Sequence, residues 1–517
     1  MTAGPRFSIL TPVYDPPIDV LRDTIDSVLR QEFTDWEWIL VDDLSPNPAV
    51  RDLLRETAAH NSRVRVIERQ SNGGIVVASQ DALSAARGEF VALLDHDDLL
   101  TPNALTLVAA TIDEMPSVDY VYSDEDKVSA TGEFYDAFAK PDWSPERLRG
   151  QMYTSHFSVI RTESMRAVGG FREGFEGSQD HDLVLRVTEQ ARAVAHVPEI
   201  LYHWRVVPGS TAERADAKPY AWESGLRAVQ DHLRRIGMAA EAELGPVPGT
   251  YRIRRHPELE RSVSVIIPTR GSSGVVHGIE RVFVTEAVRS LLKGTRHTDL
   301  EVVVVYDEDT PQTVLDELHE IAGSRLTLVL FSGPFNFSRK CNEGYLAARG
   351  EVLLFLNDDV EVISDELIGQ MLAPLNEPNV GMTGALLFYE DGLVQHGGHR
   401  YHEGLFTHAY QAVPGDSTGA FGALIVNREA SGLTAACVAI PRSVFAEVGG
   451  FSEQLPANFN DVDFSKKVGV AGYRMLFLAD ARLYHYESRT REPRVEAFEH
   501  MLILQRWGNP AYDPYLA

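Results

Sequence analysis

The stretch FVALLDHDD, residues 90–98, decides the fold, because a run of five apolar residues ends there in clustered aspartates. A second stretch of the same kind, VLLFLNDD, occupies residues 352–359. Carboxylates gathered at the end of a buried strand are costly unless something positive binds among them. The sequence therefore predicts a buried strand that leads into a cation site, and it predicts this twice.

The features that follow each stretch repeat in the same order. Each copy continues with the string VGGF, then with two aspartates one residue apart, then with a Tyr-His pair. These are residues 168–171, Asp180 with Asp182, and Tyr202-His203 in the first copy, and residues 448–451, Asp461 with Asp463, and Tyr484-His485 in the second. Such an order, repeated over about half the chain, indicates two copies of one site.

Length and composition restrict the class of protein. A chain of 517 residues is too long for one hydrophobic core and predicts two domains. Its net charge of −27 argues against nucleic acid as a partner and gives no help in docking to anionic lipid. The two cysteines, Cys341 and Cys437, fit a reducing compartment without disulfides. Since we find neither a signal peptide nor about 18 consecutive apolar residues, we expect a cytoplasmic protein.

Hydrophobic periodicity predicts that strands alternate with helices in each half. The expected strands are 7–13, 36–41, 64–67 and 90–94, then 263–267, 302–305, 326–330 and 352–356. The expected helices are 18–30, 48–59 and 75–86, then 281–292, 311–322 and 338–348. This alternation predicts an α/β fold with a parallel sheet, helices on both faces and ligands at the carboxyl ends of the strands.

A Pro/Gly stretch, GPVPGTY at residues 245–251, marks the expected boundary between the halves. We expect an N-terminal domain at 1–240 that includes a connecting helix, a linker at 241–261, and a C-terminal domain at 262–517 that ends in a helix near 495–507. Asp97 and Asp180 are 83 positions apart, whereas Asp359 and Asp461 are 102 apart. The second domain therefore carries 19 extra residues, placed within 396–431, where we expect substrate choice to diverge.

The first acidic clusters suit a hard divalent cation such as Mg²⁺ or Mn²⁺, which prefers carboxylate oxygens and keeps positions open for water and phosphate. A helix cap is the simpler explanation for one such cluster, but two copies at matching points favour the metal. His203 and His485 follow their second acidic clusters by 23 and 24 positions. An imidazole in this place can add a ligand to a metal held by Asp97 or Asp359.

The second acidic clusters, SQDHDL at residues 178–183 and FNDVDF at residues 459–464, fall at expected helix starts. One carboxylate can cap the helix while the other faces a cleft, where it is suited to act as a general base. The alternative is that the carboxylates of these clusters only cap their helices and take no part in catalysis. The chain has no GxxxxGK[ST] phosphate loop and no GxGxxG after the first strand of either copy, which argues against P-loop NTPases and dinucleotide oxidoreductases.

In this order the motifs resemble two tandem modules of glycosyltransferase family 2, of the GT-A fold, similar to those of bacterial O-antigen and rhamnose-polymer assembly. The first copy shows TPVYD (11–15), VDD (41–43), NGG (72–74), DHDD (95–98), YSDEDK (122–127) and YHWR (202–205). The second shows IPTRG (267–271), FNFSRKCNEG (335–344), LNDDVEV (356–362), FNDVDFSKKVGVAGYR (459–474) and LYHYES (483–488).

The resemblance implies a role for each matching residue. Donor base and ribose would contact Pro12, Tyr14 and Asp43 in the first copy, and Pro268, Arg270 and Asp307 in the second. Mg²⁺ or Mn²⁺ on the donor diphosphate would be held by Asp95 and Asp97, and by Asp358 and Asp359, with His203 and His485 reaching the metal or diphosphate. Asp180 and Asp461 would be the catalytic bases. Arg270 stands where the family often has an aromatic residue, and Tyr306 where the first copy has Asp42, which bears on donor identity.

The resemblance thus implies a bifunctional, metal-dependent, inverting glycosyltransferase of a bacterial surface glycan. Its substrates would be a dTDP- or UDP-sugar and a lipid-linked glycan acceptor. The protein would reach that acceptor at the inner face of the cell membrane through a partner protein. The alternative is that one domain is a nonreactive glycan- or nucleotide-binding module, since fold does not imply function. A sugar-1-phosphate nucleotidyltransferase is less well supported, because the chain lacks the Gly- and Arg-rich N-terminal signature of that class.

Overall fold

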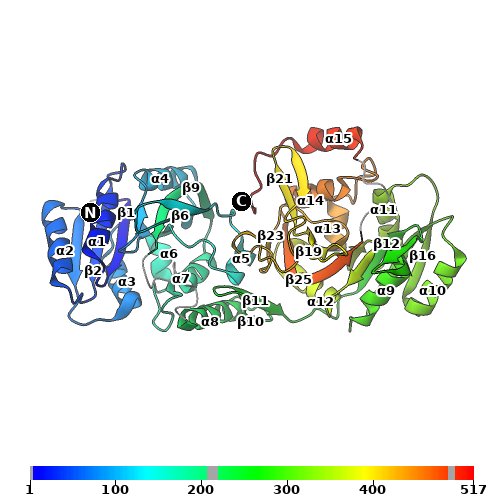
Figure 1. Cartoon of the computed structure of the whole chain (residues 1–517), viewed down its shortest axis with the longest axis horizontal. Helices are drawn as coiled ribbons and strands as arrows, with labels where there is room; N and C mark the ends of the chain where they lie inside the picture. Colours follow the sequence, from blue (N-terminus) through cyan, green and yellow to red (C-terminus); the bar gives the residue numbers. More distant parts are fainter. Residues whose placement is uncertain (1–3, 207–218, 487–494, 517) are drawn as a thin grey trace. The chain divides into compact units, whose positions relative to one another are not determined.

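A computed structural model of the chain describes residues 4–206, 219–486 and 495–516. The chain forms two compact units, and the division along the sequence falls between Ile253 and Arg254. Each unit is built on one large mixed sheet with helices on both faces (Figure 1).

The first unit contains a nine-stranded sheet in the order β3-β2-β1-β4-β8-β6-β9-β5, with β7 paired to β6. Its strands are β1 (Phe7–Val13), β2 (Trp36–Asp42), β3 (Val64–Glu68), β4 (Phe90–Leu93), β5 (Leu99–Leu100), β6 (Tyr120–Val128), β7 (Phe134–Phe138), β8 (Ser158–Arg161) and β9 (Val194–Arg205). Its helices are α1 (Ile18–Leu29), α2 (Pro48–His60), α3 (Gly74–Ala85), α4 (Ala104–Glu114), α5 (Pro145–Gly150), α6 (Thr162–Ala167), α7 (Gln179–Thr188) and α8 (Pro219–Arg235). A separate two-stranded ribbon, β10 (Ala240–Leu244) with β11 (Tyr251–Arg255), occupies most of residues 241–261.

The second unit repeats the strand order as β16-β15-β12-β17-β24-β19-β25-β18, with β20 on β19 and β23 on β25. Its strands are β12 (Val263–Thr269), β13 (Ser273–Val276), β14 (Ile279–Val282), β15 (Leu300–Asp307), β16 (Leu326–Phe331), β17 (Val352–Leu356), β18 (Val360–Val362), β19 (Val380–Phe388), β20 (Val394–His396), β21 (His399–His402), β22 (Leu405–His408), β23 (Arg428–Glu429), β24 (Cys437–Pro441) and β25 (Arg474–His485). Its α-helices are α9 (Phe283–Lys293), α10 (Gln312–Ala322), α11 (Phe337–Ala347), α12 (Leu367–Leu372), α13 (Arg442–Glu447), α14 (Asn460–Val470) and α15 (Ala497–Trp507).

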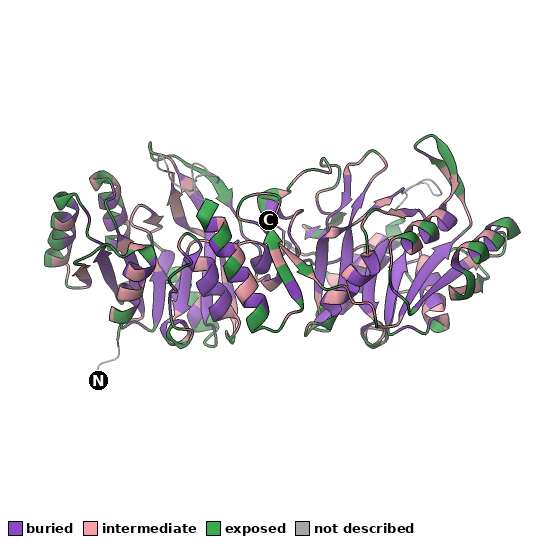
Figure 2. Ribbon diagram, turned by 90° about the horizontal axis from the view of Figure 1, so that it is seen from below, coloured by how far each residue is buried: buried purple, intermediate pink, exposed green. Residues whose placement is uncertain are grey.

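Side-chain alternation along the central strands builds a core on each face of the sheet. On β1, Phe7 and Ile9 pack with α1, α2 and α4, whereas Leu10 packs with α3, α7 and α8 on the opposite face. A strand that is covered on both faces must be apolar throughout, which explains the continuous apolar runs in the sequence. Figure 2 shows the strands as the buried layer and the outer helix surfaces as exposed.

The predicted alternation of strand and helix holds for the four predicted strands of each unit, although the second unit adds an unpredicted antiparallel hairpin, β13–β14, before α9. There β1 pairs in parallel with β2 and β4, and β12 pairs in parallel with β15 and β17. The expectation of a wholly parallel sheet is wrong beyond this point, because β8 and β24 run antiparallel to β4 and β17. Loops and short helices join the later strands, so the chain can reverse without a crossover helix.

Parallel pairing places the predicted site residues at one edge of each sheet. Strands β1, β2 and β4 all end at the edge where Tyr14, Asp43 and Asp95 follow. The register makes Pro12 and Pro268 equivalent, because Pro12 pairs with Val41 and Pro268 with Val305. The two copies of the pattern therefore become two equivalent sheet edges.

The extra residues of the second unit form a hairpin. Between β6 and β8 lie 29 residues, whereas 48 lie between β19 and β24, a difference of 19. The longer segment contains β21 paired antiparallel with β22, so that His399 lies opposite His408. The prediction that the insertion falls within 396–431 is confirmed for this hairpin.

Candidate functional site

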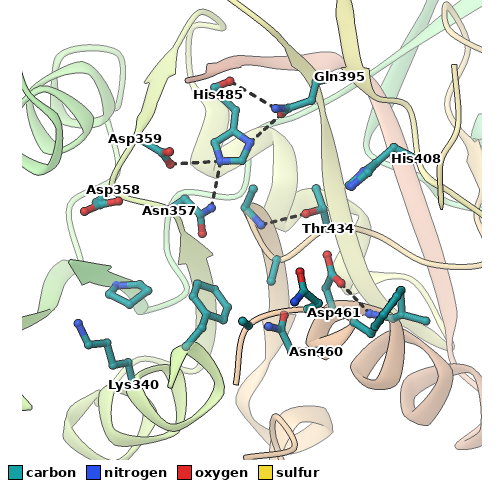
Figure 3. Close-up of a pocket in the computed structure, with 18 of the residues that line it drawn as sticks. Lys340, Asn357, Asp358, Asp359, Gln395, His408, Thr434, Asn460, Asp461 and His485 are labelled. Carbon is teal, nitrogen blue, oxygen red and sulfur yellow. Dashed lines mark hydrogen bonds and ion pairs between the residues drawn. The ribbon is translucent and has the colours of Figure 1, made fainter. Parts of the chain in front are cut away.

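The second unit has a cavity of about 360 Å³ at the carboxyl edge of its sheet (Figure 3). Its walls include the loops after β12 and β17, the start of α11, the end of β20, the β21–β22 hairpin, the segment before β24, the start of α14 and the end of β25. Six residues predicted from the sequence line it: Pro268, Arg270, Asp358, Asp359, Asp461 and His485.

Asp359 and His485 form a pair that fits a divalent metal. His485 Nε2 lies 3.1 Å from Asp359 Oδ1, and His485 Nδ1 lies 2.7 Å from Gln395 Oε1. Because the Gln395 oxygen can only accept, Nδ1 donates to it and Nε2 is the ring nitrogen that faces Asp359. A metal-binding histidine is commonly oriented in this way, by an acceptor on its other ring nitrogen.

Asn357 supplies a further oxygen at the same point. Its Nδ2 lies 3.1 Å from His485 Nε2, while its Oδ1 is buried and accepts no hydrogen bond from the described residues. A buried acceptor without a donor is costly unless a ligand satisfies it. Carboxylate, imidazole and amide groups therefore converge on a space that suits Mg²⁺ or Mn²⁺.

Asp358, the residue before Asp359, also lines the cavity. Thr269 Oγ1 donates to Asp358 Oδ2 at 2.6 Å. Burial, together with the charge of Asp359, raises the pKa of Asp358 to about 7. Burial opposes ionisation of Asp359 as well, but His485 outweighs it and lowers the Asp359 pKa. Two adjacent carboxylates with opposite shifts are typical of a functional site.

Asp461 lies at the start of α14, across the cavity from Asp359 and His485, and its side chain is partly buried (Figure 3). Its Oδ2 is 3.5 Å from His399 Nε2. Burial would raise the pKa of Asp461, but His399, together with His408 and a hydrogen bond to Thr434, outweighs it and lowers the pKa to about 2. Asp461 is thus an ionised carboxylate in the same cavity as Asp359, which is what a general base requires.

The predicted donor-binding residues of this unit surround a lysine that the sequence analysis missed. Lys340 on α11 is buried, and its Nζ lies 2.6 Å from Asp307 Oδ1 and donates to the Thr269 carbonyl at 2.8 Å. Arg270 is exposed, with its Nε 3.7 Å from Asp307 Oδ2. Lys340 stands within FNFSRKCNEG, but nothing in helical periodicity distinguishes a lysine that turns inward from one in solvent.

In the first unit the acidic cluster Asp95–Asp98 lies at the equivalent edge. Asp98 is buried, accepts a hydrogen bond from the Tyr202 hydroxyl at 2.5 Å, and has a pKa raised well above its usual range by burial and by Asp97. Burial, opposed in part by His96, also raises the pKa of Asp97. Carboxylates that resist ionisation in this way gain most from a bound cation.

His203 keeps a polar partner on Nδ1, as His485 does. Its Nδ1 lies 2.5 Å from Asp126 Oδ1, and its ring packs against Phe134. The described contacts of His203 do not include Asp95 or Asp97, the predicted metal ligands. Instead His156, which no sequence motif marked, lies with Asp95 and Asp98 so that one ligand atom of each is within 4.8 Å of the others.

Asp180, the first-unit counterpart of Asp461, starts α7 and accepts from Gln179 Nε2 at 3.0 Å. Burial and the nearby Asp95 raise its pKa to about 6. The structure therefore brings Asp180 and Asp95 close enough to interact.

The predicted donor-binding residues of the first unit are spread along the same edge. Tyr14 is exposed, and the Pro12 carbonyl accepts a hydrogen bond from His96 Nδ1 at 3.1 Å. Asp43 is buried and accepts from Gly74 N–H at 2.7 Å and from Gly73 N–H at 2.9 Å. Asp43 therefore stabilises the start of α3. Its counterpart in the second unit, Asp307, instead contacts Lys340.

Replacing Gln395 by Leu is expected to weaken Mn²⁺ binding in the second unit by about 10–100-fold, because His485 loses the acceptor that fixes its ring. Calorimetric titration of Mn²⁺ into an Asp97→Asn background isolates this site. Gln411→Leu, which changes an exposed residue of the same unit, is the matched control. Unchanged affinity in the Gln395 variant would contradict the assignment of His485 as a ligand.

Within residues 4–206, 219–486 and 495–516, no helix combines the length and apolar character needed to cross a membrane.

The duplication is also visible when the chain is compared with known proteins. The model of Glycosyl transferase family 2 matches twice, at residues 8–169 and 264–449. These segments contain the predicted donor residues and the first acidic cluster of each unit, while Asp180, Asp461 and the two late histidines lie beyond them.

Two relatives match along nearly the whole chain. An uncharacterised protein y4gI of Sinorhizobium fredii is 40% identical over 99% of this chain and 58% of its own length. The O-antigen biosynthesis protein RfbC of Myxococcus xanthus is 35% identical over 100% of this chain and 40% of its own length. The chain thus spans about half the length of these relatives.

Among solved structures, residues 1–349 of TarS from S. aureus in complex with UDP-GlcNAc are 20% identical to this chain, with a TM-score of 0.37 over 44% of this chain and 66% of that one. The family match covers more than half of the chain and falls on both units. The chain therefore belongs to glycosyl transferase family 2, as two α/β domains of the GT-A fold in tandem.

Proposed function

We propose that the chain is a bifunctional, metal-dependent, inverting glycosyltransferase that extends a bacterial surface glycan such as O-antigen. One active site would lie in the N-terminal domain (1–240) and one in the C-terminal domain (262–517), on either side of the linker 241–261. The observation that carries the proposal is the second-domain cavity, where Asp359, His485 and Asp461 line one space. The relatives' names, which include O-antigen biosynthesis protein and chondroitin synthase, support a glycan product.

The donor would be a nucleotide-diphospho-sugar, with dTDP and UDP as the leading candidates. Pro268, Arg270 and Asp307 would contact its base and ribose, and Lys340 would hold Asp307 in place. Asp358, Asp359 and His485 would hold Mg²⁺ or Mn²⁺, which when bound offsets the negative charge of a departing diphosphate. Pro12, Tyr14, Asp43, Asp95, Asp97 and His203 would take the same parts in the first domain.

Asp461 would remove the proton from an acceptor hydroxyl, whose oxygen attacks the anomeric carbon on the face opposite the diphosphate. The new glycosidic bond forms as the bond to the diphosphate breaks, so the anomeric configuration inverts. Asp180 would do the same in the first domain. The acceptor would be a glycan, lipid-linked and presented at the inner face of the cell membrane, with membrane association through a partner protein.

The test is to assay Asp180→Asn and Asp461→Asn singly with nucleotide-sugar donors and synthetic acceptors, and to identify each linkage by NMR. Each variant is expected to lose one linkage and keep the other. If each single variant still makes every linkage, the two-site proposal fails.

One observation favours the second candidate function, in which only the second domain reacts. In the first domain His156 lies beside Asp95 and Asp98, and although burial opposes its protonation, Glu125 and these aspartates raise its pKa to about 9. A cationic imidazole can neutralise the cluster without a metal. The second domain has Ala436 at this position of the register, five residues before Pro441 as His156 is five before Arg161. Titration of Mn²⁺ and nucleotide into an Asp359→Asn variant separates the two candidates.

A further inference from the structure

The β21–β22 hairpin supplies one wall of the second-domain cavity. His399, Phe406, Thr407 and His408 all line the space that Asp359 and Asp461 border. The hairpin belongs to the 19-residue excess of this domain over the first. A wall that one copy of a duplicated site has and the other lacks is suited to distinguish their substrates.

His399 is held in place by burial and by two hydrogen-bond contacts. It is buried, its backbone N–H donates to the Gly432 carbonyl at 2.8 Å, and its Nδ1 is 3.1 Å from the Tyr401 hydroxyl. When that hydroxyl donates to Nδ1, the ring carries its proton on Nε2, the atom that lies 3.5 Å from Asp461 Oδ2. The imidazole therefore points an N–H at the candidate base.

Phe406 offers an apolar surface beside this pair. Its ring packs against Tyr401 and Phe459 at centroid distances of 5.4 and 6.1 Å, and it remains partly accessible in the cavity. An aromatic ring fixed by other aromatic rings at the edge of a polar cavity suits the apolar face of a sugar ring.

We propose that the β21–β22 hairpin is the acceptor-recognition element of the second domain, with Phe406 as the platform for the acceptor sugar and His399 as a positioning residue for Asp461. The proposal rests on the function proposed above, in which Asp461 is the base. His399 donates to Asp461 Oδ2, while Oδ1, which accepts from the Val462 N–H at 2.9 Å, faces the acceptor hydroxyl with its remaining lone pair.

The charges around Asp461 explain why His399 matters. The titratable groups that face Asp461 are His399 and Tyr401 on β21 and His408 on β22, and beyond Tyr401 lie Lys466 on α14 and Asp513 in the C-terminal segment. Burial favours the neutral acid at Asp461, and His399 is the main group that opposes it. Removing His399 leaves only His408 and the Thr434 hydrogen bond to oppose burial, so the pKa of Asp461 rises and the ionised base is lost as the pH falls.

Three histidines, His396, His399 and His408, are spaced closely enough to hold a metal ion. Their hydrogen bonds argue against a metal at this place. Thr434 N–H donates to His396 Nε2 at 3.2 Å, so His396 carries its proton on Nδ1. That proton lies on the 2.6 Å contact between His396 Nδ1 and His408 Nδ1. A protonated Nδ1 cannot bind a metal. The contact between His396 and His408 is therefore a hydrogen bond between two neutral imidazoles, and it stabilises the hairpin.

The test measures kcat/KM for the second-domain linkage from pH 5 to 8.5 in the wild type, His399→Ala, His399→Gln and the control His402→Ala, which changes a histidine of the same hairpin outside the cavity lining. His399→Ala is expected to lose at least about tenfold at pH 5.5 and to approach the wild type at pH 8, because an acid limb moves into this range. His399→Gln keeps an N–H donor and is expected to show a smaller loss. A loss that is equal at every pH, or a profile like the wild type, overturns the role of His399.

Phe406→Ala tests the platform, with Leu405→Ala as its exposed neighbour and control. The KM for the acceptor is expected to rise about fivefold to tenfold while donor hydrolysis without acceptor is unchanged. An unchanged acceptor KM overturns the platform. If Asp461→Asn retains the second linkage, the proposed function fails; if it abolishes that linkage while the hairpin variants behave like the wild type, only the present inference fails.

Discussion

Replacing Asp359 by Asn is expected to abolish metal-dependent donor binding in the second domain. The substitution removes the carboxylate charge that faces His485 Nε2 at 3.1 Å, and it leaves Asp358 with a pKa raised by burial as the neighbouring acid. A bound divalent ion provides several kcal/mol of charge stabilisation, so the second linkage should form about 10³-fold more slowly. The measurement is metal-dependent release of nucleoside diphosphate with an acceptor specific to the second domain.

Asp365→Asn is the matched control for this prediction, because Asp365 is an exposed aspartate of the same domain. It should retain the wild-type rate and Mn²⁺ dependence. If Asp359→Asn kept the full Mn²⁺ response, the convergence of Asp359, His485 and Asn357 would not be a metal site.

Replacing Asp461 by Asn is expected to lower kcat for the second linkage by about 10²–10⁴-fold, since the amide cannot accept the acceptor proton. Donor affinity should stay near that of the wild type, because Asp461 lies on the acceptor side of the cavity, across from Asp359. Rapid-quench kinetics and nucleotide titration separate the two effects. Asp416→Asn, in an exposed loop of the same domain, controls for charge.

The first linkage should be unaffected by Asp461→Asn and lost in Asp180→Asn. A variant of Asp461 with a lower donor affinity and an unchanged kcat would place this carboxylate in donor binding and contradict its role as a base.

Much of the fold could be predicted from the sequence, because continuous apolar runs such as residues 263–267 and 352–356 leave little choice but buried strands. The repeated order of Asp359, Asp461 and His485 also placed these residues at one edge, and the structure brings them to one cavity. Strand order after β4 and β17 could not be predicted, since parallel and antiparallel neighbours mix there and the connections no longer repeat one strand–helix unit.

The residues that the sequence analysis missed are those whose importance depends on a tertiary contact. Lys340 on α11 turns toward Asp307, and Gln395 on β20 reaches His485 from 90 positions away. His399 lies in an insertion whose length was visible but whose hairpin carries no strong periodicity. Tertiary packing, not local pattern, gives these side chains their partners.

The central claim is that each domain holds its own metal-dependent donor site, and calorimetric stoichiometry tests it most directly. UDP, dTDP and GDP are titrated in the presence of Mn²⁺ into the wild type, Asp97→Asn and Asp359→Asn. We predict two sites per chain for the wild type and one for each variant, with none remaining in the double variant. A single site in the wild type, or one that both substitutions leave intact, would contradict the account.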